Sequence, residues 1–111
     1  LGVFANSITQ YGKIFVTGDG LQSRDFIYVG DVARANLIAA KKIQEISGQT
    51  FNICSGTHQT ILSVAENFKA QIEFIPERTG EARISWGSNQ KFVEATGWKA
   101  TLSIDDYIKS L

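Results

Sequence analysis

The chain has 111 residues, of which 43% are hydrophobic and 20% are charged, and its eleven basic side chains balance eleven acidic ones. This composition is typical of a globular domain, so we expect residues 1–111 to form a single domain, and zero net charge argues against nucleic acid as a partner. No apolar run approaches the roughly 20 residues that a membrane span needs, so we expect no membrane partner either.

Cysteine and histidine each occur once, as Cys54 and His58. These two residues do not make a Cys/His metal site, so no metal is expected, and a single cysteine fits the reducing cytoplasm, where we expect the protein. We interpret Cys54 as a small buried apolar residue and His58 as a polar loop residue. The chain begins at Leu1 and contains no methionine, and we therefore expect it to be part of a longer protein.

Hydrophobic periodicity in the first half of the chain predicts a helix from Leu1 to about Tyr11, a strand at 13–17 and a turn at 18–20. A second strand is predicted at 25–29. Asp31 is expected to cap the helix that follows. The apolar face of that helix is expected to carry Val32, Ala35, Ala39 and Ile43.

The second half continues the same alternation. A strand is predicted at 50–54, a helix that Thr60 caps comes next, and a further strand is predicted at 71–75. Ser88 is expected to cap a short helix that Gly97 ends, and Ser103 with Asp106 forms a capping-box pattern for the last helix. With about five short strands alternating with five helices, the sequence predicts an α/β fold.

The motifs of several enzyme classes are missing. Gly18-Asp19-Gly20 is not a dinucleotide fingerprint, because Ser23 stands where the third glycine belongs and a strand, not a helix, follows. The chain has no Walker loop and no nucleophile elbow. We interpret Asp105-Asp106 as helix-dipole and capping carboxylates. No catalytic residue is therefore predicted.

Three arginines offer a different chemistry. Arg24, Arg78 and Arg83 would form a clamp for a diphosphate, or they are ordinary surface arginines in ion pairs. The candidate ion-pair partners are Asp25, Glu77 and Glu81. Phe15 and Thr17 alternate along one strand face and would border a slot for a base, although core packing is the default expectation for Phe15.

Residues 18–40 read GDGLQSRDFIYVGDVARANLIAA, and QTFNICSG, IPERTGEAR and Gly97-Trp98 follow in order. This pattern resembles the C-terminal part of extended short-chain dehydrogenase/reductases, the NAD-dependent epimerase/dehydratase family that acts on nucleotide sugars. The resemblance implies a small C-terminal substrate-binding domain without its N-terminal Rossmann domain. In the family that missing domain binds NAD(P) and carries a Tyr-x-x-x-Lys pair.

None of the three tyrosines here has a lysine four residues later. The resemblance therefore implies that this fragment alone binds no cofactor and is inactive, while the intact protein is an enzyme that uses NAD(P). It also implies two partners, a nucleotide-diphosphate sugar and the chain's own Rossmann domain, and it leaves a homo-oligomer open.

The resemblance also implies roles for individual residues. Arg24 and Arg78 match arginines that contact the diphosphate, and Glu81 matches the acidic residue that approaches the ribose hydroxyls. Phe15 and Thr17 match the strand beside the nucleobase. The backbone N–H groups of Gly2-Val3 match the helix start that faces the phosphates.

The function implied for the intact protein is that of a UDP-glucose 4-epimerase-like enzyme, most simply for a UDP-sugar. Phe26 favours the epimerase-like subgroups, because related dehydratases often carry tryptophan there. A nucleotide-sugar dehydratase, a decarboxylase and an ADP-heptose epimerase remain open within the family. A non-catalytic binding or assembly module remains open outside it.

Overall fold

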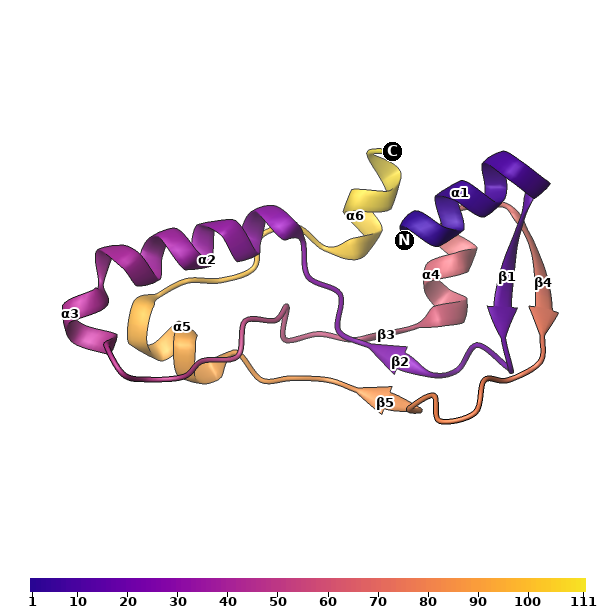
Figure 1. Ribbon diagram of the computed structural model, residues 1–111. Coiled ribbons are helices and arrows are strands. Elements are labelled where there is room, and N and C mark those ends of the chain that lie inside the picture. Colours follow the sequence, from indigo (N-terminus) through magenta and orange to yellow (C-terminus); the bar gives the residue numbers. More distant parts are fainter.

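Six helices and five strands make up the chain, which a computed structural model describes over residues 1–111 (Figure 1). In chain order they are α1 (Gly2–Tyr11), β1 (Lys13–Thr17), β2 (Ser23–Arg24), α2 (Val29–Lys41), α3 (Ile43–Ile46), β3 (Gln59–Thr60), α4 (Ile61–Asn67), β4 (Gln71–Ile75), β5 (Ile84–Ser85), α5 (Gln90–Thr96) and α6 (Ile104–Lys109). The predicted α/β class is confirmed, and α3 is the one helix more than the sequence predicts. None of these helices has the length and apolarity needed to cross a membrane.

The strands form two small sheets. β1 and β4 are parallel, with Ile14 opposite Ile72 and Val16 opposite Phe74. In the second sheet β2 lies between β3, which is antiparallel to it, and β5, which is parallel to it. The loop at 18–22 joins β1 to β2 and so connects the two sheets.

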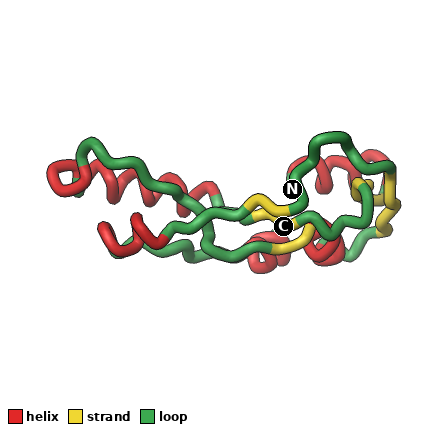
Figure 2. The backbone as a smooth tube through the Cα atoms, turned by 90° about the horizontal axis from the view of Figure 1, so that it is seen from below, coloured by secondary structure: helices red, strands yellow, loops and turns green.

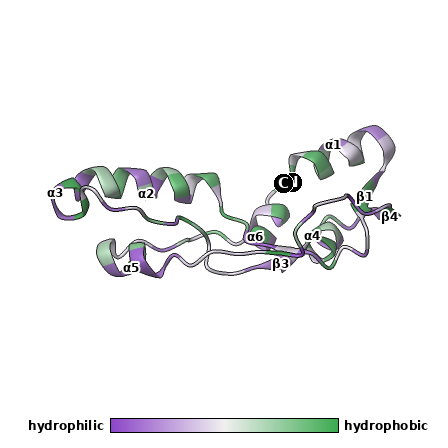
Figure 3. Cartoon of the chain, turned by 60° about the horizontal axis from the view of Figure 1, so that its bottom comes forward, coloured by the Kyte–Doolittle hydropathy of each residue, from purple (hydrophilic) through white to green (hydrophobic).

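The core is divided into three small clusters along an elongated molecule of 50 × 31 × 17 Å (Figures 1 and 2). At the α2–α3–α5 end the buried residues are Ala35, Ile46, Phe92 and Trp98. At the other end Ile14, Val16 and Ala65 pack between β1 and α4, and Val64, Ile104 and Ile108 pack between α4 and α6. Hydrophobic and hydrophilic residues are interspersed along α2, as expected for a helix that buries one face only (Figure 3).

The predicted helix caps and helix ends are confirmed where the interacting groups are close together in the sequence. The Thr60 side chain accepts a hydrogen bond from the Ser63 N–H, and Ser103 accepts one from the Asp106 N–H. Gly97 ends α5 in the left-handed conformation. Ser88 is one residue displaced from its predicted role: Asn89 is the N-cap, and the Ser88 hydroxyl instead accepts from the Gln90 N–H.

The strand predicted at 25–29 is wrong. Only Ser23–Arg24 pairs with other strands. The Asp25 N–H still bonds to the Ser85 carbonyl, but the carbonyl of Tyr28 already accepts the N–H groups of Asp31 and Val32 and starts α2. The apolar residues between Asp25 and Tyr28 therefore have no partner strand.

Asp31 does not cap α2. The N-cap is Tyr28, and Asp31 lies in the first turn with 2% of its surface exposed. Its carboxylate accepts from the N–H and hydroxyl of Thr101 at 2.9 and 2.7 Å and from the Leu102 N–H at 3.3 Å. Burial alone raises the pKa of Asp31, but these hydrogen bonds and one from Arg34 outweigh burial and lower it to about 2. Asp31 thus joins α2 to the segment before α6.

Two further predictions fail in the same half of the molecule. Residues 50–54 form no strand, because no other strand pairs with them. Side chains bond to the carbonyls at both ends of the segment, Lys91 to Thr50 at 2.9 Å and Asn89 to Cys54 at 2.9 Å. Ile43 is 55% exposed instead of buried on the face of α2, because α2 ends at Lys41 and the chain turns into α3.

Candidate functional site

A network of polar side chains lies where β1 ends and β2 begins. The loop at 18–22 brings these strand ends together, and α4 holds the loop from behind. The N–H of Leu62 donates to the Gly20 carbonyl at 2.8 Å, and the N–H of Ile61 donates to the Gln22 carbonyl at 2.9 Å. The first turn of α4, whose N–H groups have no partner within the helix, therefore fixes the loop.

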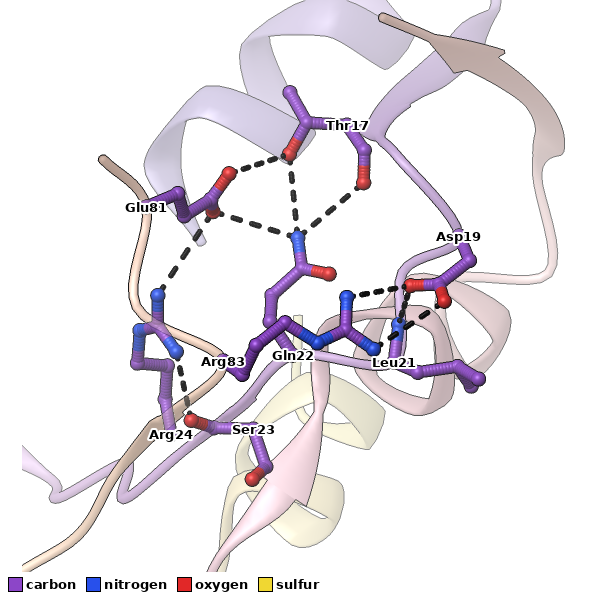
Figure 4. A network of polar contacts seen from close by, with 8 residues as sticks. All are labelled: Thr17, Asp19, Leu21, Gln22, Ser23, Arg24, Glu81 and Arg83. Atoms are coloured by element: carbon purple, nitrogen blue, oxygen red, sulfur yellow. Dashed lines mark hydrogen bonds and ion pairs between the residues drawn. The ribbon is translucent and has the colours of Figure 1, made fainter. Parts of the chain in front are cut away.

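Glu81 is the centre of this network (Figure 4). Its Oε2 accepts from the Thr17 hydroxyl at 3.1 Å, and its Oε1 lies 3.4 Å from Gln22 Nε2 and 3.8 Å from Arg24 Nη2. These partners come from β1, the loop and β2, while Glu81 itself comes from the loop between β4 and β5. The fold therefore assembles a carboxylate and a guanidinium from segments far apart in the sequence.

Arg24 keeps hydrogen-bonding capacity at this site. Its Nη1 donates to the Ser23 carbonyl at 2.8 Å, and one-quarter of its side-chain surface is exposed, the same fraction as for Glu81. Since a guanidinium has five N–H donors, several remain for a ligand. The pairing of Arg24 with Glu81 was one of the two alternatives left open by the sequence.

Arg83 is engaged elsewhere. Its two terminal nitrogens bond to the two oxygens of Asp19 at 3.0 and 3.2 Å. The Arg83 hydrogen bond holds the pKa of Asp19 below its ordinary value, and Asp19 in turn raises the pKa of Arg83. Both side chains are about half exposed, so the pair contributes little to stability.

The remaining predicted ligand residues are not joined to this network by hydrogen bonds. Arg78 is exposed in the same loop as Glu81, with no ion pair. Phe15 lies on the same face of β1 as Thr17, while the alternate residues of β1 are buried. The expectation that Phe15 packs in the core is therefore wrong. Its ring is half-buried and lies edge-on to Tyr11, with 5.6 Å between ring centroids.

Gly2 and Val3 begin α1, as predicted, and Val3 is 78% exposed. The preceding residue, Leu1, lines a cavity of about 210 Å³. That cavity is apolar and its other walls come from residues 26–29, residues 102–104 and Tyr107. The helix start therefore lies beside the apolar cavity, whereas a separate polar depression contains Thr17, Gln22 and Glu81.

Cys54 and His58 lie in the loop before β3, which contacts Asp25 and Trp86. Asp25 accepts the N–H groups of Ser55 and Gly56 at 2.9 and 3.0 Å. Burial and the nearby Asp25 carboxylate raise the pKa of the Cys54 thiol. The prediction of a buried Cys54 is met only in part, because the side chain is half-buried. A raised pKa disfavours the thiolate that a nucleophile requires. His58 is a loop residue, as predicted, and its ring stacks on Trp86 with 3.6 Å between centroids.

Asp105 has a role beyond the helix dipole. It accepts hydrogen bonds from the side chains of Gln59, at 3.2 Å, and Asn67, and so joins α6 to β3 and α4. Ser103 caps α6 by accepting from the Asp106 N–H, and its hydroxyl donates to the Asp106 carboxylate. Two of the residues that shape the polar contacts, Asn67 and Gln22, are absent from the candidate residues of the sequence. An uncharged amide gives no local signal of its partners, even where it lies within the quoted segment 18–40, as Gln22 does.

Comparison with known proteins decides the family. Residues 2–54 match the model of the NAD dependent epimerase/dehydratase family. The chain is 32% identical over 98% of its length to a putative UDP-glucose 4-epimerase of Methanocaldococcus jannaschii. It belongs to the NAD-dependent epimerase/dehydratase family. It is also 30% identical over 86% of its length to a bifunctional UDP-glucose and UDP-xylose 4-epimerase of Arabidopsis thaliana.

A solved structure shows the same fold. The crystal structure of a Bacillus cereus UDP-glucuronic acid 4-epimerase, in complex with UDP-glucuronic acid and NAD, superposes on 96% of the chain with a TM-score of 0.82 and 25% identity. The chain covers 36% of that structure, and 36% and 30% of the archaeal and plant relatives. It therefore spans about a third of the length of the proteins it matches.

The only glycine-rich loop of dinucleotide type in this chain does not fit NAD. Gly18 and Gly20 have positive φ angles of 62° and 72° and form a turn between two strands, not the strand-to-helix turn that holds a pyrophosphate. The space next to the Gly20 Cα is filled, because a Cβ there would lie 2.8 Å from Val16 Cγ1 and 2.9 Å from Leu62 Cβ. This glycine serves the packing of the loop against α4.

Proposed function

We propose that this chain is the nucleotide-sugar-binding, C-terminal portion of an NAD-dependent UDP-sugar epimerase similar to UDP-glucose 4-epimerase. The observation that carries the proposal is the pair Arg24 and Glu81, both partly exposed, with Arg24 Nη2 3.8 Å from Glu81 Oε1. Glu81 also lines the polar depression. A guanidinium suits a diphosphate, and a carboxylate suits the vicinal hydroxyls of a ribose. The two groups together match the diphosphate and the ribose of a ribonucleoside diphosphate.

The other predicted residues lie outside this network, and the proposal assigns them roles in the bound state. Arg78, exposed and without an ion pair, is available as a second phosphate ligand. Phe15 and Thr17, on the less buried face of β1, would border the base. The free N–H groups of Gly2 and Val3 would face phosphate in the bound state.

The size of the depression supports a site completed by another part of the protein. The depression encloses no space for even a water molecule, whereas a ligand pocket encloses roughly 300–1,000 Å³. In this proposal the sugar and much of the nucleotide lie between this chain and an N-terminal Rossmann domain. That domain would bind NAD(P), supply the catalytic Tyr-x-x-x-Lys pair and cover apolar surface of this chain, so this portion alone has no turnover. Homo-oligomer formation and a cytoplasmic location stay predictions.

Nucleotide binding by the chain tests this proposal. In calorimetric titrations with UDP, TDP, GDP, CDP and ADP, we expect selective binding of UDP. Arg24→Ala should weaken that binding about 10- to 100-fold, because a charge-assisted hydrogen bond contributes about 1.5–3 kcal/mol. Arg78→Ala should weaken it in the same direction.

Arg83→Ala is the matched control, because Arg83 lies at the same depression but is held by Asp19. We expect this variant to change the affinity for UDP much less than Arg24→Ala does. Preference for TDP or ADP would favour a related dehydratase or an ADP-heptose epimerase. Absence of binding by every nucleotide, with a folded chain, would contradict a recognition site that is preformed in this portion.

A further inference from the structure

Gln22 is the most buried uncharged polar side chain in the network, with 3% of its surface exposed. Its Nε2 lies 3.2 Å from the Thr17 hydroxyl, 3.3 Å from the Thr17 carbonyl and 3.4 Å from Glu81 Oε1. The opposite orientation of the amide would place a carbonyl oxygen against these acceptors, so the orientation is determined by its surroundings. The amide group therefore lies between Thr17 and Glu81 as a shared donor (Figure 4).

Two kinds of partner compete for the Glu81 carboxylate. Arg24 Nη2 lies 3.8 Å from Oε1, beyond ordinary hydrogen-bond distance. The amide of Gln22 and the hydroxyl of Thr17 donate to Oε1 and Oε2 respectively. A diphosphate that attracts Arg24 would therefore remove the weaker partner, while Gln22 and Thr17 would keep the carboxylate in place.

The backbone of Gln22 is also held. Its carbonyl accepts the N–H of Ile61 at the start of α4. The adjacent Ser23 belongs to β2, where it pairs with Thr60 and Ile84. Because both flanks are fixed, the position of the amide is set by the fold and not by the ligand.

We propose that Gln22 is a positioning residue that aligns Glu81 with the ribose hydroxyls of the bound nucleotide and so makes the site select ribonucleotides over 2′-deoxyribonucleotides. The inference rests on the proposed function and names a specificity element of that same site. A carboxylate held from behind can accept from both hydroxyls of a diol, whereas a mobile carboxylate must first be ordered at an entropic cost.

The test compares the affinities for UDP and for 2′-deoxy-UDP in the chain and in Gln22→Met, a variant of similar length without the amide. We expect the unchanged chain to bind UDP about tenfold more tightly than 2′-deoxy-UDP, since the deoxy ligand leaves a polar group of the site unpaired. In Gln22→Met this ratio should fall to about twofold or less, with the loss mainly in UDP affinity.

Two further variants keep the result interpretable. Gln22→Asn retains the amide but withdraws it by one methylene. It should lower the ratio of UDP to 2′-deoxy-UDP affinity in the same way, and it provides this test if Gln22→Met does not fold. Gln44→Met, on the exposed face of α3, is the matched control and should keep the ratio. Circular dichroism verifies that each variant is folded.

A merely structural role of Gln22 would weaken both ligands equally and leave the ratio unchanged, which would overturn the inference. Equal binding of UDP and 2′-deoxy-UDP by the unchanged chain would also overturn it, while the proposed function would stand. Failure of the unchanged chain to bind any nucleotide would instead refute the proposed function together with this inference.

Discussion

Asp31→Asn should lower the free energy of unfolding by about 2–3 kcal/mol, because one carboxylate satisfies two backbone N–H groups and a hydroxyl of the segment before α6. An asparagine keeps one acceptor oxygen and places an NH₂ group against the donors that remain. Urea denaturation at neutral pH, followed by circular dichroism, measures the difference.

The same carboxylate predicts an acid dependence. The pKa of Asp31 is lowered from 3.8 to about 2 in the folded chain, so its ionised form stabilises the fold by about 2 kcal/mol above pH 4. That contribution should disappear as the pH falls from about 4 to about 2, and Asp31→Asn should flatten the stability profile in this window.

Asp19→Asn is the matched control for the Asp31 variant. Asp19 also accepts from a backbone N–H and from an arginine, but it is about half exposed. We expect only a small change in stability there, since water replaces the lost partners. If Asp19→Asn lowered the free energy of unfolding as much as Asp31→Asn does, burial of the carboxylate would not explain the effect at Asp31.

Gly20→Ala should destabilise the chain by about 3 kcal/mol. The φ angle of 72° costs an alanine about 1 kcal/mol, and the new Cβ would lie 2.8 Å from Val16 Cγ1 and 2.9 Å from Leu62 Cβ, which adds about 1–3 kcal/mol of overpacking. The loop would have to move away from α4 and carry Gln22 with it. We therefore expect weaker UDP binding as well as a lower melting temperature.

Gly12→Ala separates the two contributions. Gly12 has nearly the same φ angle, 69°, but no atom lies within 4 Å of the Cβ position. This variant should lose only the conformational part, about 1 kcal/mol, and keep its affinity for UDP. Equal losses in the two variants would show that packing behind Gly20 is unimportant.

The parts of the fold that the sequence predicts well are those determined by neighbouring residues. The caps at Thr60 and Ser103 join a side chain to the N–H three residues later, and Gly97 adopts a conformation that glycine tolerates best. β1 and β4 are also predicted with their observed bounds, because each is a β-branched and aromatic run between turn residues.

Predictions that require a distant partner fail. Residues 25–29 and 50–54 have the composition of strands, but a strand exists only where another backbone is within hydrogen-bonding reach. Beyond Arg24 the segment loses β3 and β5, and residues 50–54 meet side chains of Asn89 and Lys91 instead. The local pattern at Asp31 predicts an N-cap, but the partners of its carboxylate lie about 70 residues later in the chain, where local spacing gives no information about them.

The sequence by itself determined the α/β class, the family and the residue types suited to a nucleoside diphosphate, since these depend on composition, local spacing and motif order. Only the tertiary structure decided that Arg24 meets Glu81, that Arg83 is bound to Asp19, and that the buried amide of Gln22 lies behind the carboxylate. The physical reason is that burial and hydrogen-bond partners are properties of segments some 60 residues apart, which become neighbours only when the chain folds.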